Sequence, residues 1–337
     1  DHGPWLHRRA PTKKNDVDPS RKEAPSTSKP PLPPVDTLFV WDFDWTIVNC
    51  NSDEYVPSAF LGDDATDRRL RDLIRTHGST RWHDCVAALV NSCMTIEQGG
   101  YSREDICGAA ERMPYLIDVR ESLGDVFAAS VDSHSCGQAI ISDGNDVFIG
   151  AFLERNGMER YFPHGIETNY GSWKEEIGPQ QENGGNNDGE GGFRVVHQST
   201  KYGGHTCQRC PPNLCKSQVL IDILGRIETG RRPNCIVYVG DGSNDACPAM
   251  NVLDDGDVLL ARDGKRIGNP NIVSGPQADV LDVDELTGAG FPILETIERR
   301  REEDGSTLRC RICPWNSGKE LRSLVRNILD KDAQNTQ

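Results

Sequence analysis

A chain of 337 residues is long enough for one large domain with a subdomain, or for two ordinary domains. Its formal net charge of -15 argues against nucleic acid and anionic membranes as partners, because both require a basic protein surface. The mean hydropathy is -0.57 and no run of about twenty apolar residues occurs, so we predict no membrane span.

Residues 1–36 are predicted to form a disordered leader. The stretch SRKEAPSTSKPPLPP is charged, Ser-rich and Pro-rich, and it has too few apolar side chains to offset the entropy of ordering. The chain opens with Asp1 rather than Met, which leaves room for a targeting peptide that has been removed. Twelve cysteines are scattered along the chain, and we expect reduced thiols in a cytoplasmic enzyme.

The stretch FVWDFDWTIVNCNSDEYV, residues 39–56, begins as an apolar strand and places acids where the strand should end. Asp42 and Asp44 stand two positions apart, so their side chains project to the same face. Two ionised carboxylates at that range repel each other, and one protonates unless a cation lies between them. The pattern predicts a metal site, a proton-transfer role, or both.

Residues 52–136 show helical rather than strand periodicity. DATDRRLRDLIRTHG repeats apolar residues at helical spacing and stops at Gly78, and RWHDCVAALVNSCM continues the pattern. SREDICGAAERM begins with a capping-box pattern from Ser102 to Asp105, and VRESLGDVFAASVDS supplies a further helix. We interpret the whole block as a helical insertion.

An α/β pattern resumes at residue 137. QAIISDGN, CIVYVGDGSND and DVLLA are typical of buried parallel strands, and helical segments alternate with them. This alternation predicts βαβ units and a Rossmann-like parallel sheet. Residues 174–193 are almost free of apolar side chains, which indicates a disordered surface loop. The expected organisation is an α/β core of residues 37–51 and 137–330, a helical insertion of residues 52–136, and a tail of residues 331–337.

Polar clusters follow three of the predicted strands. They are Asp42 with Asp44, Ser142 with Asp143, and Asp241 with Asp245. In open α/β sheets, ligands bind at the carboxyl ends of parallel strands, so neighbouring strands would bring these groups and Lys216 to one crevice. Such a cluster of acids requires a cation, and Mg²⁺ suits hard oxygen ligands.

These groups match the chemistry of phosphate transfer. A carboxylate can attack phosphorus and form an aspartyl-phosphate. Mg²⁺ and Lys216 would neutralise the phosphoryl oxygens, while Ser142 and backbone N–H groups donate hydrogen bonds to them. Asp44 is placed to protonate the leaving oxygen and afterwards to activate water.

Four ordered motifs carry a family resemblance. DFDWTIV, ISDGN, the lysine of CPPNLCKSQVL and VGDGSND resemble the motifs of the haloacid dehalogenase superfamily. More narrowly, DFDWTIVNCNSDEYV, HTCQRCPPNLCK and YVGDGSNDACPAM resemble the group of phosphoethanolamine/phosphocholine phosphatases and pyridoxal-phosphate phosphatases. The resemblance covers roughly residues 37–330. It implies a haloacid-dehalogenase-like core and a cap formed by the helical block.

The resemblance implies the catalytic and metal-binding roles. Asp42 would be the nucleophile and Asp44 the general acid and base. Mg²⁺ would bind Asp42, the carbonyl of Asp44 and Asp241. Asp245 would either bind the metal or hold a metal-bound water.

Phosphate and substrate contacts are also implied by the resemblance. Ser142 and Lys216 would bind the phosphate, and acids at the positions of Asp53 and Asp143 are associated with substrate contact in that group.

Trp45 departs from the group, which has smaller or charged residues at this position. We therefore expect a narrower pocket mouth and a different substrate preference.

The sequence predicts a Mg²⁺-dependent phosphomonoester phosphatase that acts on a small phosphorylated metabolite. Phosphoethanolamine or phosphocholine is the first choice, because Asp53 and Asp143 would attract a cationic amine. Pyridoxal 5'-phosphate is the alternative, with Trp45 as a stacking surface. The motifs also allow a phosphomutase or phosphotransferase, and the oligomeric state stays open.

A cysteine-rich segment permits a different interpretation. Its candidate metal ligands are His205, Cys207, Cys210 and Cys215, with Cys310 and Cys313 as a second pair. Zinc, disulfides and free thiols all remain open, and we favour loop cysteines that pack beside Lys216 and help to orient it. A non-catalytic zinc-binding scaffold is the alternative of another class, which the intact pair of Asp42 and Asp44 disfavours.

Overall fold

The computed structural model describes most of the chain in two units, residues 1–30 and residues 31–337, and everything below concerns the second. The described residues are 29–78, 81–95, 100–133, 135–173, 192–202, 204–228, 231–264, 275–277 and 290–335. The predicted loop of residues 174–193 therefore lies outside the described residues, except for its last two.

The predicted leader extends too far at its carboxyl end. Leu32 is buried, and its backbone N–H donates to the carbonyl of Arg226 at 2.8 Å. The Leu32 side chain belongs to an apolar cluster of the core, and that burial fixes the backbone around it. Most of the predicted leader, residues 1–28, lies outside the described residues.

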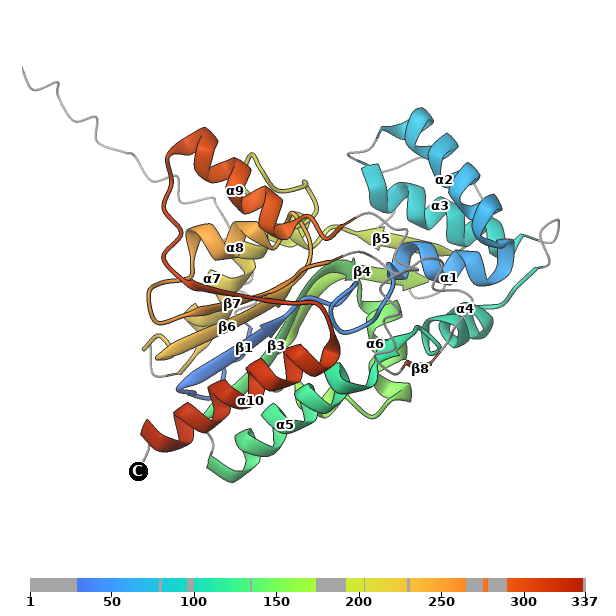
Figure 1. The fold of residues 1–337 in the computed structure, drawn as a ribbon. Helices are drawn as coiled ribbons and strands as arrows, with labels where there is room; N and C mark the ends of the chain where they lie inside the picture. Colours follow the sequence, from blue (N-terminus) through green and yellow to red (C-terminus); the bar gives the residue numbers. More distant parts are fainter. Residues whose placement is uncertain are drawn as a thin grey trace, which may run out of the picture. The chain divides into compact units, whose positions relative to one another are not determined.

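A seven-stranded sheet with the strand order β5-β4-β3-β1-β6-β7-β9 forms the centre of this unit (Figure 1). Its strands are β1 (Thr37–Trp41), β3 (Cys136–Asn145), β4 (Ile166–Trp173), β5 (Phe193–Val196), β6 (Cys235–Gly240), β7 (Val258–Arg262) and β9 (Arg311–Trp315). Within this sheet, β4 and β5 pair antiparallel and the other neighbours pair parallel. The predicted α/β fold is confirmed.

Helices cover both faces of the sheet (Figure 1). On one face lie α7 (Lys216–Arg226), α8 (Ala246–Asn251) and α9 (Ile293–Asp304). On the other lie α5 (Ile117–Ser133) and α10 (Gly318–Asn335), which pack against each other. The strands between them are buried on both sides, which explains why β1 and β7 are almost wholly apolar.

The remaining elements are α6 (Asp146–Arg155), the 3₁₀ helices Glu159–Tyr161 and Gln198–Tyr202, and the short parallel pair β2 (Tyr115–Leu116) and β8 (Pro276–Gln277).

Four further helices pack together as a group, which Figure 1 shows in blue to teal. They are α1 (Ser52–Leu61), α2 (Asp63–His77), α3 (Trp82–Met94) and α4 (Arg103–Ala110). Cys85 and Leu89 of α3 are buried against Leu70 of α2, because the apolar stripes of both helices face each other.

The structure divides the predicted helical block of residues 52–136. α5 packs on β3 and α10 rather than with α1 to α4. Val119, Leu123 and Val126 are its buried stripe, and this stripe faces the sheet cluster. Helical periodicity reveals such a stripe but not its partner, so the block was assigned as one unit. We propose residues 52–113 as the cap.

The cap is also tied to the edge strand of the sheet. The side-chain amide of Asn91 on α3 donates to the carbonyl of Phe193 at 3.0 Å, and its oxygen accepts from the N–H of Phe193 at 2.9 Å. Phe193 is the first residue of β5 and is buried, so it does not belong to the predicted loop of residues 174–193. The side chain of Asn91 thus forms hydrogen bonds with both the N–H and the carbonyl of Phe193.

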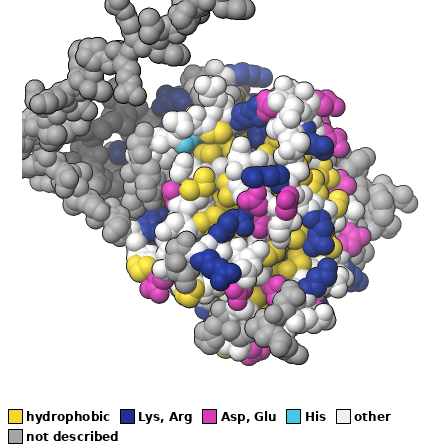
Figure 2. Space-filling model, turned by 90° about the vertical axis from the view of Figure 1, so that its left-hand side faces the viewer, with side chains coloured by type: hydrophobic (Ala, Val, Ile, Leu, Met, Phe, Trp, Pro, Cys, Tyr) yellow, Lys and Arg dark blue, Asp and Glu magenta, His cyan; other side chains and the backbone are white. Residues whose placement is uncertain are grey.

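Surface charge is mixed on the face that Figure 2 shows. Lys and Arg side chains alternate there with Asp and Glu, and apolar side chains lie between them. Among the helices that the structure describes, each is too short or too polar to span a bilayer.

Candidate active site

The register of the sheet brings the polar strand ends together. Trp41, the last residue of β1, pairs with Ile140 of β3 and with Val239 of β6. The next residues of all three strands therefore lie at the same end of the sheet, where β1 and β6 stop and β3 continues to Asn145. The segments that do so are Asp42 to Asp44, Ser142 to Asp143, and Asp241 to Asp245.

A buried lysine lies at the centre of this cluster. Lys216 Nζ is 2.7 Å from Asp42 Oδ2 and 2.7 Å from Asp245 Oδ1. Tyr238 donates its hydroxyl hydrogen to the same Asp245 oxygen at 2.8 Å. Burial alone would lower the pKa of Lys216, but the carboxylates of Asp245 and Asp42 outweigh it and raise that pKa. The lysine is therefore a permanent cation between two acids.

Asp245 is held by backbone groups as well. Its Oδ2 accepts from the N–H of Gly242 at 2.8 Å and from the N–H of Asp241 at 3.2 Å. Gly240 permits this position, because a Cβ there would lie 2.5 Å from Asp245 Cγ. The last position of β6 thus requires glycine.

The same acids fit a divalent cation. Ligand oxygens of Asp42, Asp241 and Asp245 lie within 4.8 Å of one another, and all three residues are buried. Oxygens around Mg²⁺ lie about 2.1 Å from the metal, and hence about 3 to 4.2 Å apart. Burial and the charge of Asp245 raise the pKa of Asp42 well above 3.8, although Lys216 opposes them. One lysine does not neutralise three buried acids, so the donor set suits Mg²⁺.

Asp44 is positioned by the start of α1. Its carboxylate accepts from the N–H of Ser52 at 3.0 Å and from the hydroxyl of Ser52 at 3.1 Å. Burial raises the pKa of Asp44 well above 3.8, and the charges of Asp53 and Asp143 raise it further. A carboxyl group with a raised pKa can donate a proton near neutral pH, as a general acid must.

Asp53 and Asp143 lie close enough to Asp44 to affect its pKa, but other groups hold them. Trp82 Nε1 donates to Asp53 Oδ2 at 2.8 Å, which joins α3 to α1 within the cap. Asn244 Nδ2 donates to Asp143 Oδ2 at 2.9 Å. Burial raises the pKa of Asp53 above 3.8, and the charge of Asp143 adds to this. Asp143 is the more exposed of the two.

Ser142 lies within β3 and is fully buried. Its hydroxyl oxygen accepts from the N–H of Gly144 at 3.1 Å, so the side chain faces the strand end from which Asp143 projects. The structure thus places each predicted site residue around one end of the sheet.

Sequence reasoning missed two residues that position this end of β3. His83 Nε2 on α3 lies 2.9 Å from the carbonyl oxygen of Asp143. Asn169 of β4 donates to the same carbonyl at 2.7 Å. A lone histidine on an amphipathic helix gives no sequence signal for such a contact.

A third missed residue holds the loop that follows Asp44. Arg262 at the end of β7 donates to the carbonyl of Trp45 and, at 2.7 Å, to Asn49 Oδ1. Trp45 has a φ of 56° and is buried, with its ring edge-on to Phe291 at 6.1 Å. The ring that was expected to narrow the pocket mouth, or to offer a stacking surface, has a packing partner instead.

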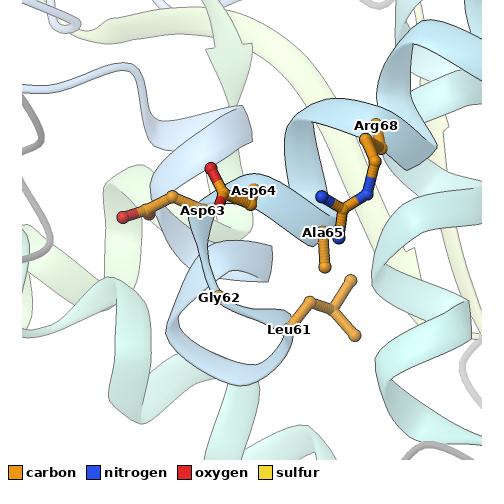
Figure 3. Close-up of a pocket in the computed structure, with 6 residues that line it drawn as sticks. All are labelled: Leu61, Gly62, Asp63, Asp64, Ala65 and Arg68. Atoms are coloured by element: carbon orange, nitrogen blue, oxygen red, sulfur yellow. The ribbon is translucent and has the colours of Figure 1, made fainter.

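A pocket of about 420 Å³ lies on the cap at the junction of α1 and α2. Figure 3 shows Asp63 directed away from the side where Leu61, Ala65 and Arg68 lie. Its lining contains none of the clustered acids, so this pocket is separate from the candidate active site.

Comparison with known proteins agrees with this geometry. Residues 37–271 match the family model described as "Putative Phosphatase", a range that includes the whole acid cluster. The chain belongs to this phosphatase family. As predicted, it is a phosphoric monoester hydrolase of the haloacid dehalogenase type.

Individual relatives of the phosphatase carry different substrate names. It is 30% identical over 229 residues to a pyridoxal phosphate phosphatase of Mus musculus, covering 67% of this chain and 82% of that one. It is 26% identical over 296 residues to a phosphoethanolamine/phosphocholine phosphatase of Homo sapiens, covering 87% and 89%. A solved phosphoserine phosphatase with a phospho-aspartyl intermediate analogue shares 15% identity at a TM-score of 0.40, covering 68% and 87%.

Proposed function

We propose that this phosphatase hydrolyses a small phosphomonoester with a cationic head group through an aspartyl-phosphate on Asp42, with Mg²⁺ as its cofactor. The observation that carries the proposal is the buried contact of Lys216 with Asp42 and Asp245 at the carboxyl ends of β1 and β6. Phosphoethanolamine or phosphocholine is the first choice of substrate. The name of one relative and the acids around Asp44 support it.

Asp42, Asp241, Asp245 and the carbonyl of Asp44 would hold the metal. When bound there, Mg²⁺ neutralises phosphoryl charge and relieves the repulsion among the buried acids. Lys216 adds a fixed positive charge beside the nucleophile, and Ser142 would donate its hydroxyl hydrogen to a phosphoryl oxygen.

The reaction needs one nucleophile and one proton donor. A carboxylate oxygen of Asp42 attacks phosphorus, and the bond from phosphorus to the leaving oxygen breaks. Asp44 gives its proton to the leaving oxygen, a role for which its raised pKa suits it. Asp44 then accepts a proton from the water that attacks the aspartyl-phosphate. The bond between phosphorus and the Asp42 oxygen breaks, which regenerates the carboxylate and releases inorganic phosphate.

A cationic head group explains the otherwise unfavourable excess of acids. Asp53 and Asp143 are not metal ligands in this proposal, and the charges of both raise the pKa of Asp44. An ammonium group close to them would offset that repulsion. Pyridoxal 5'-phosphate is the second candidate, because a relative that is 30% identical bears that name.

Steady-state kinetics on phosphoethanolamine, phosphocholine and pyridoxal 5'-phosphate, each with Mg²⁺ and with EDTA, test the proposal. We expect Mg²⁺-dependent release of phosphate, with the highest kcat/KM for one of the two amines. Equal and poor turnover of all three would reject the substrate assignment. Hydrolysis unaffected by EDTA would reject the metal.

All twelve cysteines are unbonded thiols, and they lie in the part of the chain that the structure describes. Reduced thiols fit a cytoplasmic enzyme, which we include in the proposal. Fractionation of the native source tests the compartment.

A further inference from the structure

Four cysteines converge at one point behind the candidate active site. They are Cys207, Cys210, Cys215 and Cys247, and their sulfur atoms lie within 4.8 Å of one another. The first three precede or begin α7, whereas Cys247 comes from α8, more than thirty residues away. Cys247 Sγ is 3.9 Å from Cys207 Sγ and 3.9 Å from Cys215 Sγ.

These sulfur–sulfur distances match a tetrahedral metal site. A disulfide requires about 2.05 Å between its sulfur atoms, so neither pair is bonded. Zinc binds thiolates at about 2.3 Å, and the edges of the resulting tetrahedron are about 3.8 Å long. The three buried cysteines contact each other as a cluster separate from the main apolar core. Ordinary packing of thiols does not require such a convergence of sulfur atoms.

We propose that Cys207, Cys210, Cys215 and Cys247 bind one Zn²⁺ ion as a closed, structural site. Four protein ligands leave no open position for substrate, which is the pattern of structural rather than catalytic zinc. The site is accessible for loading because Cys207 is half-exposed, while the other three cysteines are buried.

This ligand set corrects the one that the sequence suggested. His205 Nε2 lies 2.8 Å from the carbonyl of Pro211, outside the cluster. Cys310 contacts the carbonyl of Ala249 at 3.9 Å, and Cys313 belongs to β9. Cys247 was missed because it lies 32 positions after Cys215, so the two do not show the short spacing of zinc motifs.

The groups around the sulfur atoms suit thiolates. Ser217 donates its hydroxyl hydrogen to Cys247 Sγ at 3.0 Å, and Asn251 Nδ2 donates to the same atom at 3.4 Å. Such donors around a metal-bound thiolate orient it and spread its charge. Cys215 is the N-cap of α7, an 11-residue helix, where the positive end of the helix dipole favours a thiolate.

The proposed zinc ion would position the catalytic lysine. Cys215 directly precedes Lys216, and Cys247 lies two residues after Asp245, whose carboxylate is 2.7 Å from Lys216 Nζ. A metal that joins these two cysteines links the starts of α7 and α8 beside that ion pair. Loss of the metal should therefore loosen the contact between Lys216 and Asp245.

Metal analysis of the untagged full chain tests the proposal without reference to enzyme activity. We expect one zinc per chain after dialysis against Mg²⁺ buffer, and none in Cys247→Ser. Reloading with Co²⁺ should give thiolate-to-cobalt charge-transfer absorption and the visible bands of a tetrahedral ion. Wild-type protein without bound zinc, in which all four thiols react with a thiol reagent, would overturn the proposal.

Matched variants separate metal loss from misfolding. Cys313→Ser alters the other Cys-x-x-Cys pair and should keep its zinc. Cys207→His replaces a half-exposed ligand with another zinc ligand and should retain the metal, whereas Cys207→Ser should lose it. Equal zinc content in Cys207→Ser and wild type would contradict the ligand set.

The positioning role has a separate readout. Inorganic phosphate, used as a competitive inhibitor, should bind more weakly to Cys207→Ser than to Cys207→His, because Lys216 is less well placed. Equal inhibition of the two variants would reject the role of zinc in positioning Lys216, but it would not contradict zinc binding itself. This last step rests on the proposed function, whereas the zinc measurement does not.

Discussion

At the scale of single residues, the candidate site is a balance of buried charge. Lys216 and Asp245 are fully buried and Asp42 is 3% exposed, so solvent screens their charges poorly. One cation faces three acids of the proposed metal site. Removing an acid and removing the cation should therefore change stability in opposite directions.

Asp42→Asn should abolish turnover without loss of stability. The amide cannot attack phosphorus, and the loss in kcat should exceed about a thousandfold. The change also removes one repelling charge, so the Tm in EDTA should equal or exceed that of wild type. Phosphate release and thermal unfolding measure the two effects, with Asp222→Asn on the exposed side of α7 as the control. Near-normal activity would show that Asp42 is not the nucleophile.

Lys216→Met should destabilise the fold by about 3 to 5 kcal/mol, because it leaves two buried carboxylates without their partner. Urea unfolding measures this change. Adding Asp245→Asn to that variant should restore part of the stability, since one of the unpaired charges is gone. If the double variant instead lost the sum of the stabilities lost in the two single variants, repulsion between unpaired acids would not be the cause of the Lys216→Met effect.

Substrate binding should depend on pH through Asp53. Its pKa is raised by burial, so it loses its charge at a higher pH than an ordinary aspartate. Above that pKa the carboxylate attracts the amine, and as the pH falls through it the KM for phosphocholine should rise. The choline head group keeps its charge at every pH. Dividing the KM for phosphocholine by the KM for a phosphomonoester with an uncharged head group cancels the effect of phosphate titration. In Asp53→Asn this ratio should no longer change with pH.

At the scale of elements, the strand ends were predictable and the sheet edges were not. β1, β3 and β6 are apolar runs that end in acids, and the rule for parallel sheets then predicts one shared site. β4, with the sequence IETNYGSW, carries polar side chains and pairs antiparallel with β5, so its periodicity is weak. β9 contains Pro314, which a strand at the edge tolerates but which argues against a strand in sequence analysis.

Tertiary contacts hid the remaining parts of the site. Tyr238 appears in the sequence as one more apolar residue of β6, and only the fold shows its hydroxyl on Asp245. Arg262 ends a buried strand, and its link to the loop after Asp44 spans more than two hundred residues. Local patterns carry no signal for such contacts.

Gly240→Ala should weaken Mg²⁺ binding by about 10- to 100-fold, because the added methyl group displaces the carboxylate of Asp245. The Mg²⁺ concentration for half-maximal activity measures this. Gly150→Ala on α6 is the control, since a Cβ there meets nothing within 4 Å and should stabilise the helix by up to about 1 kcal/mol. Unchanged Mg²⁺ affinity in Gly240→Ala would argue against Asp245 at the metal.

At the scale of the molecule, the proposed cap contacts the core close to the reacting groups. Asp42 and Asp241 are each 3% exposed, and we expect substrate to reach them through a movement of α1 to α4. His83 on α3 contacts the carbonyl of Asp143 at the end of β3, and this bond joins the two parts. We expect this contact to break when the cap opens.

His83→Ala should raise KM more than it lowers kcat, because it weakens closure without removing a reacting group. Amide hydrogen exchange along β3 should accelerate in the same variant. His77→Ala on α2 is the matched control and should change neither quantity. A fall in kcat at constant KM would instead place His83 in the chemistry.

The bond of Asn91 to both backbone groups of Phe193 limits how the active site can open. β5 is paired with β4 on its other side, so lifting α3 straight off the sheet would break two hydrogen bonds or peel an edge strand away. Tilting about that fixed corner avoids both costs. If the cap opens in this way, we expect substrate to enter and phosphate to leave at the side of the site farthest from β5.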